Sequence, residues 1–274
     1  MNSRPLTISV VTPSFNQAKY VEQTMLSVLN QDYPHIEYLV LDGGSTDGSV
    51  DLIRKQAGRL AYSHSGKDGG QSDAIANGFA RATGDILCWL NSDDVFLPGA
   101  LRKVAEYFER HPTVEAVCGG AYIIDAEGRP VKRFGHCTLG VGAPFDRFLF
   151  YGQDGVYQQA TFWRRSAYEA VGGLNRDLHF IMDRDLFARL ARRQSFGTLP
   201  SLLACFRIHE ECKTRCIPHV QRRESEAFFG RYGREQCSPM ARSWNYWRFR
   251  LPSLARKARL FFLVQTGWLR LQPV

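Results

Sequence analysis

The sequence predicts an α/β protein in which a mostly parallel central sheet is flanked by helices. Short runs of apolar and β-branched residues, such as residues 6–11 and 36–41, have the length and composition of buried strands. Stretches with apolar residues three and four positions apart follow these runs, and this is the period of an amphipathic helix. Strands and helices that alternate in this way form parallel sheets with right-handed crossovers.

The first units of this pattern are short. Residues 6–11 (LTISVV) predict a strand because they are rich in β-branched residues, and residues 19–30 predict a helix on their apolar spacing. Residues 36–41 predict the second strand. Residues 50–56, with Asp and Ser available as caps, predict a short helix. Residues 60–63 predict a weak third strand.

Longer elements follow in the middle of the chain. A glycine-rich loop at residues 66–72 leads into a helix through residues 74–82, and the apolar residues 86–90 predict a buried strand. A helix begins near Pro98, which suits a first helical position, and ends before His111-Pro112.

The second half is less regular. The sequence predicts strands at residues 114–119, 121–125, 159–163, 196–199 and 203–208, and a helix that begins near Asp183. Residues 134–157 contain several glycines and little periodicity, so we expect a long loop that could fold over a ligand.

The charge is unevenly distributed. The net charge of the chain is +8, but residues 213–274 hold thirteen Lys and Arg and three Glu, a net charge of +10, which leaves residues 1–212 at −2. Such asymmetry indicates an anionic partner, either a membrane surface or a nucleic acid, and a solvated helical face is the alternative. We expect a reducing compartment because the seven cysteines are scattered, and we expect neither a secretory leader nor a membrane span.

Polar residues follow the predicted strand at residues 86–90. Asn91, Ser92, Asp93 and Asp94 come directly after it, so two adjacent carboxylates lie at the carboxyl end of a strand, where α/β sheets bind ligands. Hard oxygen ligands at this place suit a divalent cation that also contacts a phosphate. The alternative is that Asp93 and Asp94 only cap the following helix.

Three strand ends converge in this prediction. The first strand carries Thr12-Pro13-Ser14-Phe15, the second carries Asp42 with a glycine-rich loop, and the fourth carries residues 91–94. Glycines allow a ligand to approach the backbone closely, and helix N-termini favour phosphate. The pattern indicates a pocket for a nucleoside diphosphate and a metal. It is neither a dinucleotide-binding GxGxxG site nor a P-loop, because both motifs are absent from the sequence.

Eight stretches together carry a family resemblance. They are SVVTPSFNQ, VLDGGSTDGS, KDGGQSDAIANGF, ATGDILCWLNSDDVFLPGAL, QQATFWRRS, GGLN, IMDRDLFARL and FRIHEECKT. In this order, over roughly residues 7–216, the chain resembles the inverting family 2 glycosyltransferases of GT-A fold that assemble bacterial polysaccharide and lipopolysaccharide. The resemblance implies a catalytic domain over residues 1–215, followed by a basic, aromatic-rich helical extension over residues 216–274.

The resemblance assigns a nucleotide and sugar pocket to several positions. Its predicted members are Thr12, Pro13, Phe15, Asp42, Lys67, Asp68, Gln71, Asn91 and Asp94. Pro13 and Phe15 would line the base, and Asp42 would accept a hydrogen bond from the base or the ribose. Relatives often have two consecutive acids where this chain has Asp42-Gly43, which puts that contact in question.

The resemblance also implies a metal site. The stretch after residue 90 matches the DxD motif of the family, with Asn91 in place of the first acid. Asp93 aligns with the metal-binding position, and His209 aligns with a histidine near the diphosphate and the metal. The expected cofactor is Mn²⁺ or Mg²⁺, which acts as a Lewis acid on the departing diphosphate. Loss of one anionic ligand at Asn91 would weaken metal binding.

Asp183 is the predicted catalytic base. It aligns with the acidic residue of the family segment matched here by MDRDLFARL, and Leu186, Phe187 and Leu190 follow it at helical spacing. We therefore expect its side chain to point with the buried face of the helix, and Asp185 to lie on another face with a structural role. By the family mechanism, Asp183 would deprotonate an acceptor hydroxyl in a single displacement with inversion.

The predicted function is therefore transfer of a sugar from a nucleotide-diphospho-sugar, with UDP as the expected nucleotide, to a saccharide or lipid-linked acceptor. The expected location is cytoplasmic, with the basic and aromatic tail on an anionic inner membrane face and no nucleic acid partner. A catalytically weak relative that serves as a scaffold is the alternative. The pattern HxxCxxxCxxH from His209 to His219 could indicate zinc, but it matches no common zinc module.

Overall fold

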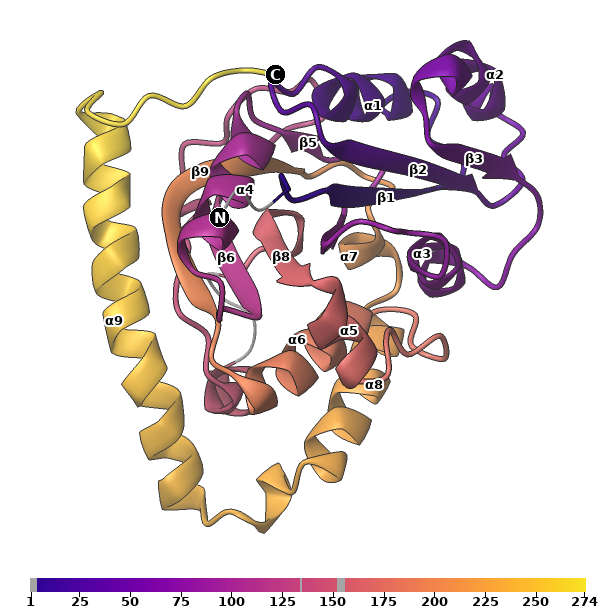
Figure 1. Cartoon of the computed structure of the whole chain (residues 1–274). Helices are drawn as coiled ribbons and strands as arrows, with labels where there is room; N and C mark the ends of the chain where they lie inside the picture. The colour runs from indigo at the N-terminus through magenta and orange to yellow at the C-terminus, as the bar shows by residue number, and fades with distance from the viewer. Residues whose placement is uncertain (1–3, 134, 152–155) are drawn as a thin grey trace.

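A mixed sheet of nine strands forms the centre of the described part of the molecule, and helices cover both of its faces (Figure 1). The computed structural model describes residues 4–133, 135–151 and 156–274. The strands are β1 (Ile8–Ser14), β2 (Ile36–Asp42), β3 (Tyr62–Ser65), β4 (Ile86–Trp89), β5 (Val95–Phe96), β6 (Ala116–Ile124), β7 (Cys137–Thr138), β8 (Thr161–Arg164) and β9 (Gly197–Arg207). The main helices are α1 (Val21–Leu29), α2 (Ser49–Lys55), α3 (Gln71–Phe79), α4 (Ala100–Arg110), α5 (Arg165–Ala170), α6 (Met182–Arg193), α7 (Lys213–Cys216), α8 (Pro218–Arg231) and α9 (Pro239–Gln265).

Most of the sheet is parallel, as the sequence predicts. The strands lie in the order β3-β2-β1-β4-β8-β6-β9-β5, and β7 pairs with β6. β1 pairs in parallel with β2 and β4, β2 with β3, and β6 with β9. β8 is antiparallel to both β4 and β6, so these two strands also share a direction. Only β5, β7 and β8 among the described strands run the other way, and all three are short.

Two apolar clusters fill the space between the sheet and the helices. One lies under α1, α2 and α4, and the other under α3, α5, α6 and α8. Among the aromatic side chains of the second cluster are Phe79, Trp89, Trp163 and Phe187, whose neighbouring ring centroids lie 5.6 to 6.3 Å apart. Edge-on packing of this kind adds to the stabilisation that burial of large rings already provides.

Two pairs of predicted strands are single strands in the structure. Residues 114–119 and 121–125 belong to β6, and residues 196–199 and 203–208 belong to β9. Gly119 and Gly120 lie inside β6 and do not interrupt it. A Cβ on Gly120 would lie 2.5 Å from the carbonyl oxygen of Thr138, so glycine is present there because β7 approaches closely.

The loop predicted over residues 134–157 is also more ordered than expected. It contains β7 and a short π-helix, η2 (Arg147–Tyr151), while residues 134 and 152–155 lie outside the described residues. Phe148 is fully buried against Phe187 and Phe196, with centroids 6.4 and 5.8 Å away. The part of the segment around Phe148 therefore belongs to the core.

The last part of the chain packs back on the sheet. The buried Phe228 of α8 joins the aromatic cluster, and residues 269–274 return to the edge near β5 and β6 (Figure 1). The hydroxyl of Tyr122 donates a hydrogen bond of 2.6 Å to the carbonyl of Gln272, and the Val274 N–H donates one of 3.1 Å to Gly128. Within the described residues, none of the helices combines the length and the apolar character that crossing a bilayer requires.

We expect Trp163→Ala to lower the free energy of unfolding by about 3–5 kcal/mol, because it removes a fully buried ring between β8 and α6. Urea denaturation measures this change. Trp268→Ala is the matched control, since this ring is exposed and should change stability by less than about 0.5 kcal/mol. Equal losses in both variants would contradict the packing described here.

Candidate active site

The carboxyl ends of β1, β2 and β4 meet at one edge of the sheet, as the sequence predicts. Ser14 at the end of β1 pairs with Asp42 at the end of β2, and Trp89 at the end of β4 pairs with Val11. The loops that leave these strands carry the candidate residues. Side chains from α3, α6, β9 and α7 approach the same edge, and they complete the site described below.

The carboxylate of Asp42 holds the loop that follows β2. Its Oδ2 accepts hydrogen bonds from the N–H groups of Gly44 and Ser45, at 3.0 and 2.9 Å, and from the Ser65 hydroxyl at 2.7 Å. Its Oδ1 accepts a fourth from the Ser45 hydroxyl at 2.5 Å. Asp42 is buried, so this carboxylate shapes the loop instead of presenting itself to a ligand.

Gly43 lies close to side chains from the loops after β1 and β3. A Cβ built on Gly43 would lie 3.3 Å from the ring of Phe15 and 3.3 Å from each carboxylate oxygen of Asp68. Phe15 is exposed, and Asp68 is half-buried and accepts a 2.8 Å hydrogen bond from the Gly70 N–H. The absence of a side chain at Gly43 therefore lets the Phe15 ring and the Asp68 carboxylate approach the backbone closely.

The remaining predicted residues of this pocket differ in exposure. Lys67 is exposed on the loop before α3, and Pro13 is buried at the end of β1. Thr12 is fully buried, and its hydroxyl accepts a 3.0 Å hydrogen bond from Tyr38. Thr12 thus supports the strand from inside, while Phe15 and Lys67 face solvent.

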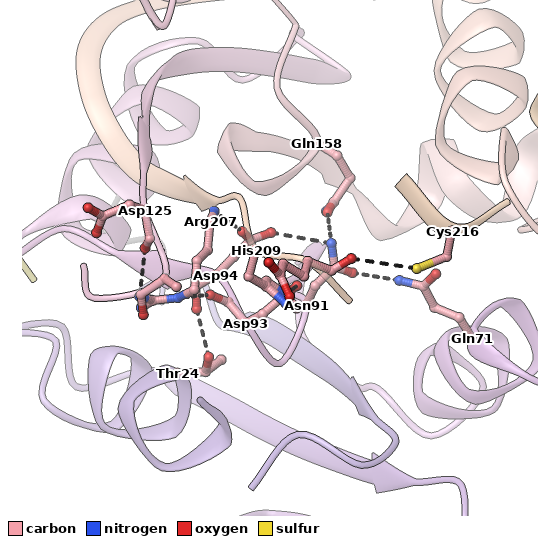
Figure 2. A network of polar contacts seen from close by, with 12 residues as sticks. Thr24, Gln71, Asn91, Asp93, Asp94, Asp125, Gln158, Arg207, His209 and Cys216 are labelled. Carbon is pink, nitrogen blue, oxygen red and sulfur yellow. Dashed lines mark hydrogen bonds and ion pairs between the residues drawn. The ribbon is translucent and has the colours of Figure 1, made fainter. Parts of the chain in front are cut away.

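A buried arginine fixes the acidic residues after β4. Arg207, the last residue of β9, donates its backbone N–H to Oδ1 of Asp94 at 2.9 Å and its Nε to the carbonyl of Asp93 at 2.8 Å (Figure 2). Its Nη2 donates to Gln23 at 2.6 Å, and its guanidinium lies 4.8 Å from the ring centroid of Tyr20. Arg207 therefore ties β4, β9 and α1 together at one point.

Asp93 and Asp94 point in different directions from this anchor. Asp94 is fully buried, and burial, with the nearby Asp93 charge, raises its pKa well above its usual range. Asp93 is partly exposed, and its Oδ2 lies 3.0 Å from Nε2 of His209. Oδ1 of Asp93 accepts no hydrogen bond from the described residues. Asp93 is therefore the more exposed member of this pair, and His209 is buried behind it.

This pair is suited to part of a metal site. A carboxylate oxygen and an imidazole nitrogen are ligands for Mn²⁺, and the tilted ring of Tyr20, 4.8 Å from His209, holds the imidazole in place. No group of three or more His, Cys, Asp or Glu side chains placed to hold a metal occurs within the described residues. A cation bound here would therefore need further oxygen ligands from a diphosphate or from water.

The zinc alternative finds no support in the geometry. Among the described residues, His209 contacts Asp93, whereas Cys212 is buried and Cys216 is exposed with its thiol 3.8 Å from the carbonyl of Glu210 (Figure 2). The four residues of the HxxCxxxCxxH pattern do not form a metal-binding group.

A chain of side-chain hydrogen bonds runs from α7 to the end of β4, and Figure 2 shows its part through Gln71, Asn91 and Gln158. Nζ of Lys213 donates to Oε1 of Gln71 at 2.7 Å, and Nε2 of Gln71 donates to Oδ1 of Asn91 at 2.8 Å. Nδ2 of Asn91 lies 3.3 Å from Asp94 and 3.4 Å from Oε1 of Gln158. Nε2 of Gln158 ends the chain on the carbonyl of Trp89 at 2.7 Å.

The direction of this chain explains the amide at Asn91. An ammonium can only donate, so Lys213 fixes the oxygen of Gln71 toward itself and its nitrogen toward Asn91. Asn91 must then turn its own nitrogen toward Asp94, which can accept it. An aspartate at this position would place a second carboxylate against the buried Asp94, and like charges at this distance repel.

The proposed base lies in the first turn of α6. Asp183 is only partly buried, and its Oδ1 accepts a hydrogen bond from the Arg184 N–H at 2.7 Å. The expectation that it shares the buried face with Leu186 is wrong. Asp185 is the buried acid, and it pairs with Arg189 and Arg231 at 2.8 and 3.3 Å.

Glu224 of α8 positions the segment before α6. Its carboxylate accepts hydrogen bonds from three consecutive N–H groups, those of His179, Phe180 and Ile181, at 2.8 to 3.0 Å. Burial opposes ionisation of Glu224, but these three bonds prevail and hold its pKa below the usual value. Burial lowers the pKa of Lys213, and the negative charges of Asp183 and Glu224 oppose this shift.

Sequence reasoning missed four of these residues. Arg207, Lys213, Gln158 and Glu224 were not predicted as site residues, although the first three lie within or beside stretches that carry the family resemblance. A charged residue at the end of an otherwise apolar strand was the available signal for Arg207. Glu224 left no such signal, because its partners lie 43 to 45 positions away on another segment.

Comparison with known proteins agrees with this geometry. The sequence model described as "Glycosyl transferase family 2" matches residues 9–172. The chain belongs to this family. An uncharacterised glycosyltransferase of Mycobacterium tuberculosis is 33% identical over 195 residues, which cover 70% of this chain and 71% of the relative. A putative teichuronic acid biosynthesis glycosyltransferase of Bacillus subtilis is 32% identical over 138 residues, covering 49% of this chain and 54% of that protein.

Solved structures show the GT-A fold. A mannosyltransferase from Pyrobaculum calidifontis, in complex with GDP-Man and Mn²⁺, aligns with a TM-score of 0.59 at 18% identity. The alignment covers 96% of this chain and 76% of the mannosyltransferase. TarS of S. aureus (residues 1–349, with UDP-GlcNAc) aligns with a TM-score of 0.57 at 17% identity. This alignment covers 77% of this chain and 61% of the TarS chain. A longer TarS structure also aligns, and the present chain covers only 37% of its length.

We expect Asp42→Asn to lower stability by about 1–3 kcal/mol, because an amide cannot accept from all four donors that the carboxylate satisfies. Thermal or urea unfolding measures the loss. The control is Asp51→Asn, an exposed acid on α2 whose loss should cost less than about 0.5 kcal/mol. An Asp42→Asn protein as stable as the wild type would show that the loop does not depend on this carboxylate.

Proposed function

We propose that the protein transfers a sugar from a nucleotide-diphospho-sugar to an acceptor hydroxyl with inversion at the anomeric carbon. The observation that carries this proposal is the pairing of Asp93 with His209 at the edge of the sheet, joined through the Lys213 chain to the region of Asp183. Family 2 membership and the nucleotide-sugar complexes of the two fold neighbours support it.

The rim formed by Phe15, Gly43 and Asp68 is the proposed place of the nucleotide base. Phe15 would stack on the base with Pro13 beneath it, and Asp68 would accept from a base N–H or a ribose hydroxyl. Lys67, on the same rim, adds a positive charge for the diphosphate. UDP remains the proposed nucleotide, supported by the UDP and UDP-GlcNAc complexes of TarS, whereas the mannosyltransferase binds GDP-Man.

Asp93 and His209 are the residues that would hold Mn²⁺ or Mg²⁺. Oδ1 of Asp93 and Nε2 of His209 fit this role, because Oδ1 accepts no hydrogen bond from the described residues and Nε2 bonds only the other oxygen of the same carboxylate, so one cation could take ligands from both side chains. A bound cation supplies Lewis acid chemistry, since it stabilises the negative charge of the leaving diphosphate. Asp94 and Arg207 hold Asp93 from behind.

Asp183 is the proposed general base. Its partial exposure suits a carboxylate that must reach an acceptor hydroxyl. As the acceptor oxygen forms its bond to the anomeric carbon, the hydroxyl proton passes to Asp183, and the bond from carbon to the diphosphate oxygen breaks on the opposite face. Glu224 holds the backbone before α6, and thereby the base, in position.

Asn91 does not favour the scaffold alternative. The amide fits the hydrogen-bond chain better than a carboxylate would, so this departure from the DxD pattern is accommodated by its surroundings. The Bacillus subtilis relative, named for teichuronic acid synthesis, supports a role in assembling a bacterial surface polysaccharide.

We expect the purified protein to hydrolyse or transfer from a nucleotide-sugar in the presence of Mn²⁺, and to lose this activity when a chelator removes the cation. Asp183→Asn should lower kcat by about 10²–10⁴-fold and leave donor affinity within a few-fold, because the base acts only in the chemical step. Coupled detection of released nucleoside diphosphate measures both.

Asp177→Asn is the matched control, since this exposed acid lies six positions before Asp183 and outside the site. A wild-type rate in Asp183→Asn would remove the base assignment. Failure to bind or use any of a panel of UDP-, GDP- and dTDP-sugars would overturn the proposed function itself.

We expect the affinity for a nucleoside diphosphate to fall as the pH rises through about 8. Burial lowers the pKa of Lys213 to about 8, against the opposing charges of Asp183 and Glu224. Below this pH the group is an ammonium that attracts the diphosphate, and above it the group is neutral. A bound diphosphate favours the ammonium, so the midpoint should lie at or above 8.

Titration calorimetry with UDP at several pH values tests this expectation. Lys213→Met should bind UDP about 10-fold more weakly at neutral pH and lose the pH dependence in this range. Lys55→Met, which removes an exposed lysine at the end of α2, should keep both. An unchanged pH profile in Lys213→Met would show that this lysine does not cause the pH dependence of UDP binding.

A further inference from the structure

One face of α9 carries an uncovered apolar stripe. Its members are Met240, Trp244, Trp247, Leu251 and Phe262, with exposed fractions of 82, 71, 46, 60 and 63%. They recur at spacings of three and four residues, and the exposed Ala255 and Ala258 fill the gap before the last of them. Such a spacing places all of them on one side of a helix. Large aromatic side chains exposed in a row are a mark of a binding surface.

The rest of the structure fixes this face outward. The opposite side of α9 buries Ser253, Leu260 and Val264, and α9 packs against η2 and β7. Ser238 caps its first turn, and residues 269–274 bind the edge of the sheet after its last turn. In Figure 1 the helix runs along the outside of the molecule between these two attachments. The stripe is therefore the outer face of an anchored helix.

The charges of α9 indicate what covers the stripe. The helix contains six basic residues and no acidic one, and residues 236–274 contain no Asp or Glu at all. Arg248 and Arg259 are exposed and flank the stripe on the same side. Tryptophan beside arginine is typical of helices that lie in the interface of a membrane, where the rings enter the headgroup region and the cations meet anionic lipids.

We propose that this face of α9 binds the surface of a bilayer that contains anionic lipids, with the helix axis parallel to the membrane plane. A second copy of the chain is disfavoured as the occupant, because a symmetric contact would bring two wholly basic helices together. The proposal stands apart from the catalytic site. Its consequence, that a lipid-linked acceptor is presented to the enzyme at the membrane, rests on the proposed function.

Vesicle binding of the full chain tests this proposal. We expect it to sediment with vesicles of phosphatidylcholine and phosphatidylglycerol, and far less with phosphatidylcholine alone or at high salt. Trp89 and Trp163 are buried, so a blue shift of tryptophan fluorescence on binding should come from the exposed rings of the tail. Trp244→Ser with Trp247→Ser should weaken binding by roughly tenfold or more and remove most of the shift.

Charge variants provide a matched comparison. Arg248→Gln with Arg259→Gln should weaken binding to the anionic vesicles, whereas Arg54→Gln with Arg110→Gln, two exposed arginines on α2 and α4, should bind as the wild type. Equal weakening in both pairs would mean that net charge alone drives binding, and would overturn the proposal.

Light scattering tests whether a second copy of the chain covers the stripe instead. A chain that is dimeric in solution, becomes monomeric in the Trp244→Ser and Trp247→Ser variant, and ignores vesicles would assign the stripe to a second copy. Absence of vesicle binding by a monomeric wild type would also overturn the proposal. Transfer to a water-soluble acceptor should stay unchanged in the tryptophan variant, so failure here is distinguishable from failure of the proposed function.

Discussion

The buried guanidinium of Arg207 is the interaction on which the site depends. It bonds the carbonyl of Asp93 from the end of β9, and its backbone N–H bonds the carboxylate of Asp94. Further bonds to Gln23 and to the turn after β6 satisfy the rest of the group. A buried charge is tolerated only when its donors are satisfied, and loss of one partner of such a group typically costs about 3–5 kcal/mol. The same bonds that satisfy the cation therefore fix the acidic end of β4.

The hydrogen-bond chain from Lys213 to Gln158 determines which donor and acceptor atoms its members present to one another. Because each member has a fixed donor and acceptor side, one ammonium at the end of the chain determines the orientation of two glutamines and one asparagine. This arrangement favours an amide at Asn91 and makes a second carboxylate there unfavourable. It also means that charge at the diphosphate end and hydrogen bonding at β4 are coupled. Residues on α3, β4 and α7 act as one unit.

The C-terminal helices serve the catalytic part in two ways. α8 contributes Phe228 to the core and Glu224 to the segment that carries Asp183, so this helix is part of the machinery. α9 spans the outside of the molecule, and its inner face packs while its outer face presents aromatic and basic residues. The tail thus combines support of the base with a surface suited to an anionic membrane. Shortening the chain before α8 would disturb both functions together.

The sequence by itself determined the element order, the parallel part of the sheet and the three strand ends that form the site, because strand and helix periods and turn residues are local signals. It also predicted Asp93, His209 and Asp183 as site residues through short motifs. Only the tertiary structure decided how these residues divide their roles. It buried Asp42, Asp94 and Asp185 within their own partners, and it joined Lys213 and Glu224 to residues far away in the chain. The tertiary structure also determines which face of α9 is exposed. One side of the helix packs against the rest of the molecule, so the opposite, apolar side is left in solvent. Contacts between distant segments produce no periodic pattern in the sequence. The hydrogen-bond partners of each carboxylate depend on such contacts, so the sequence alone could not predict them.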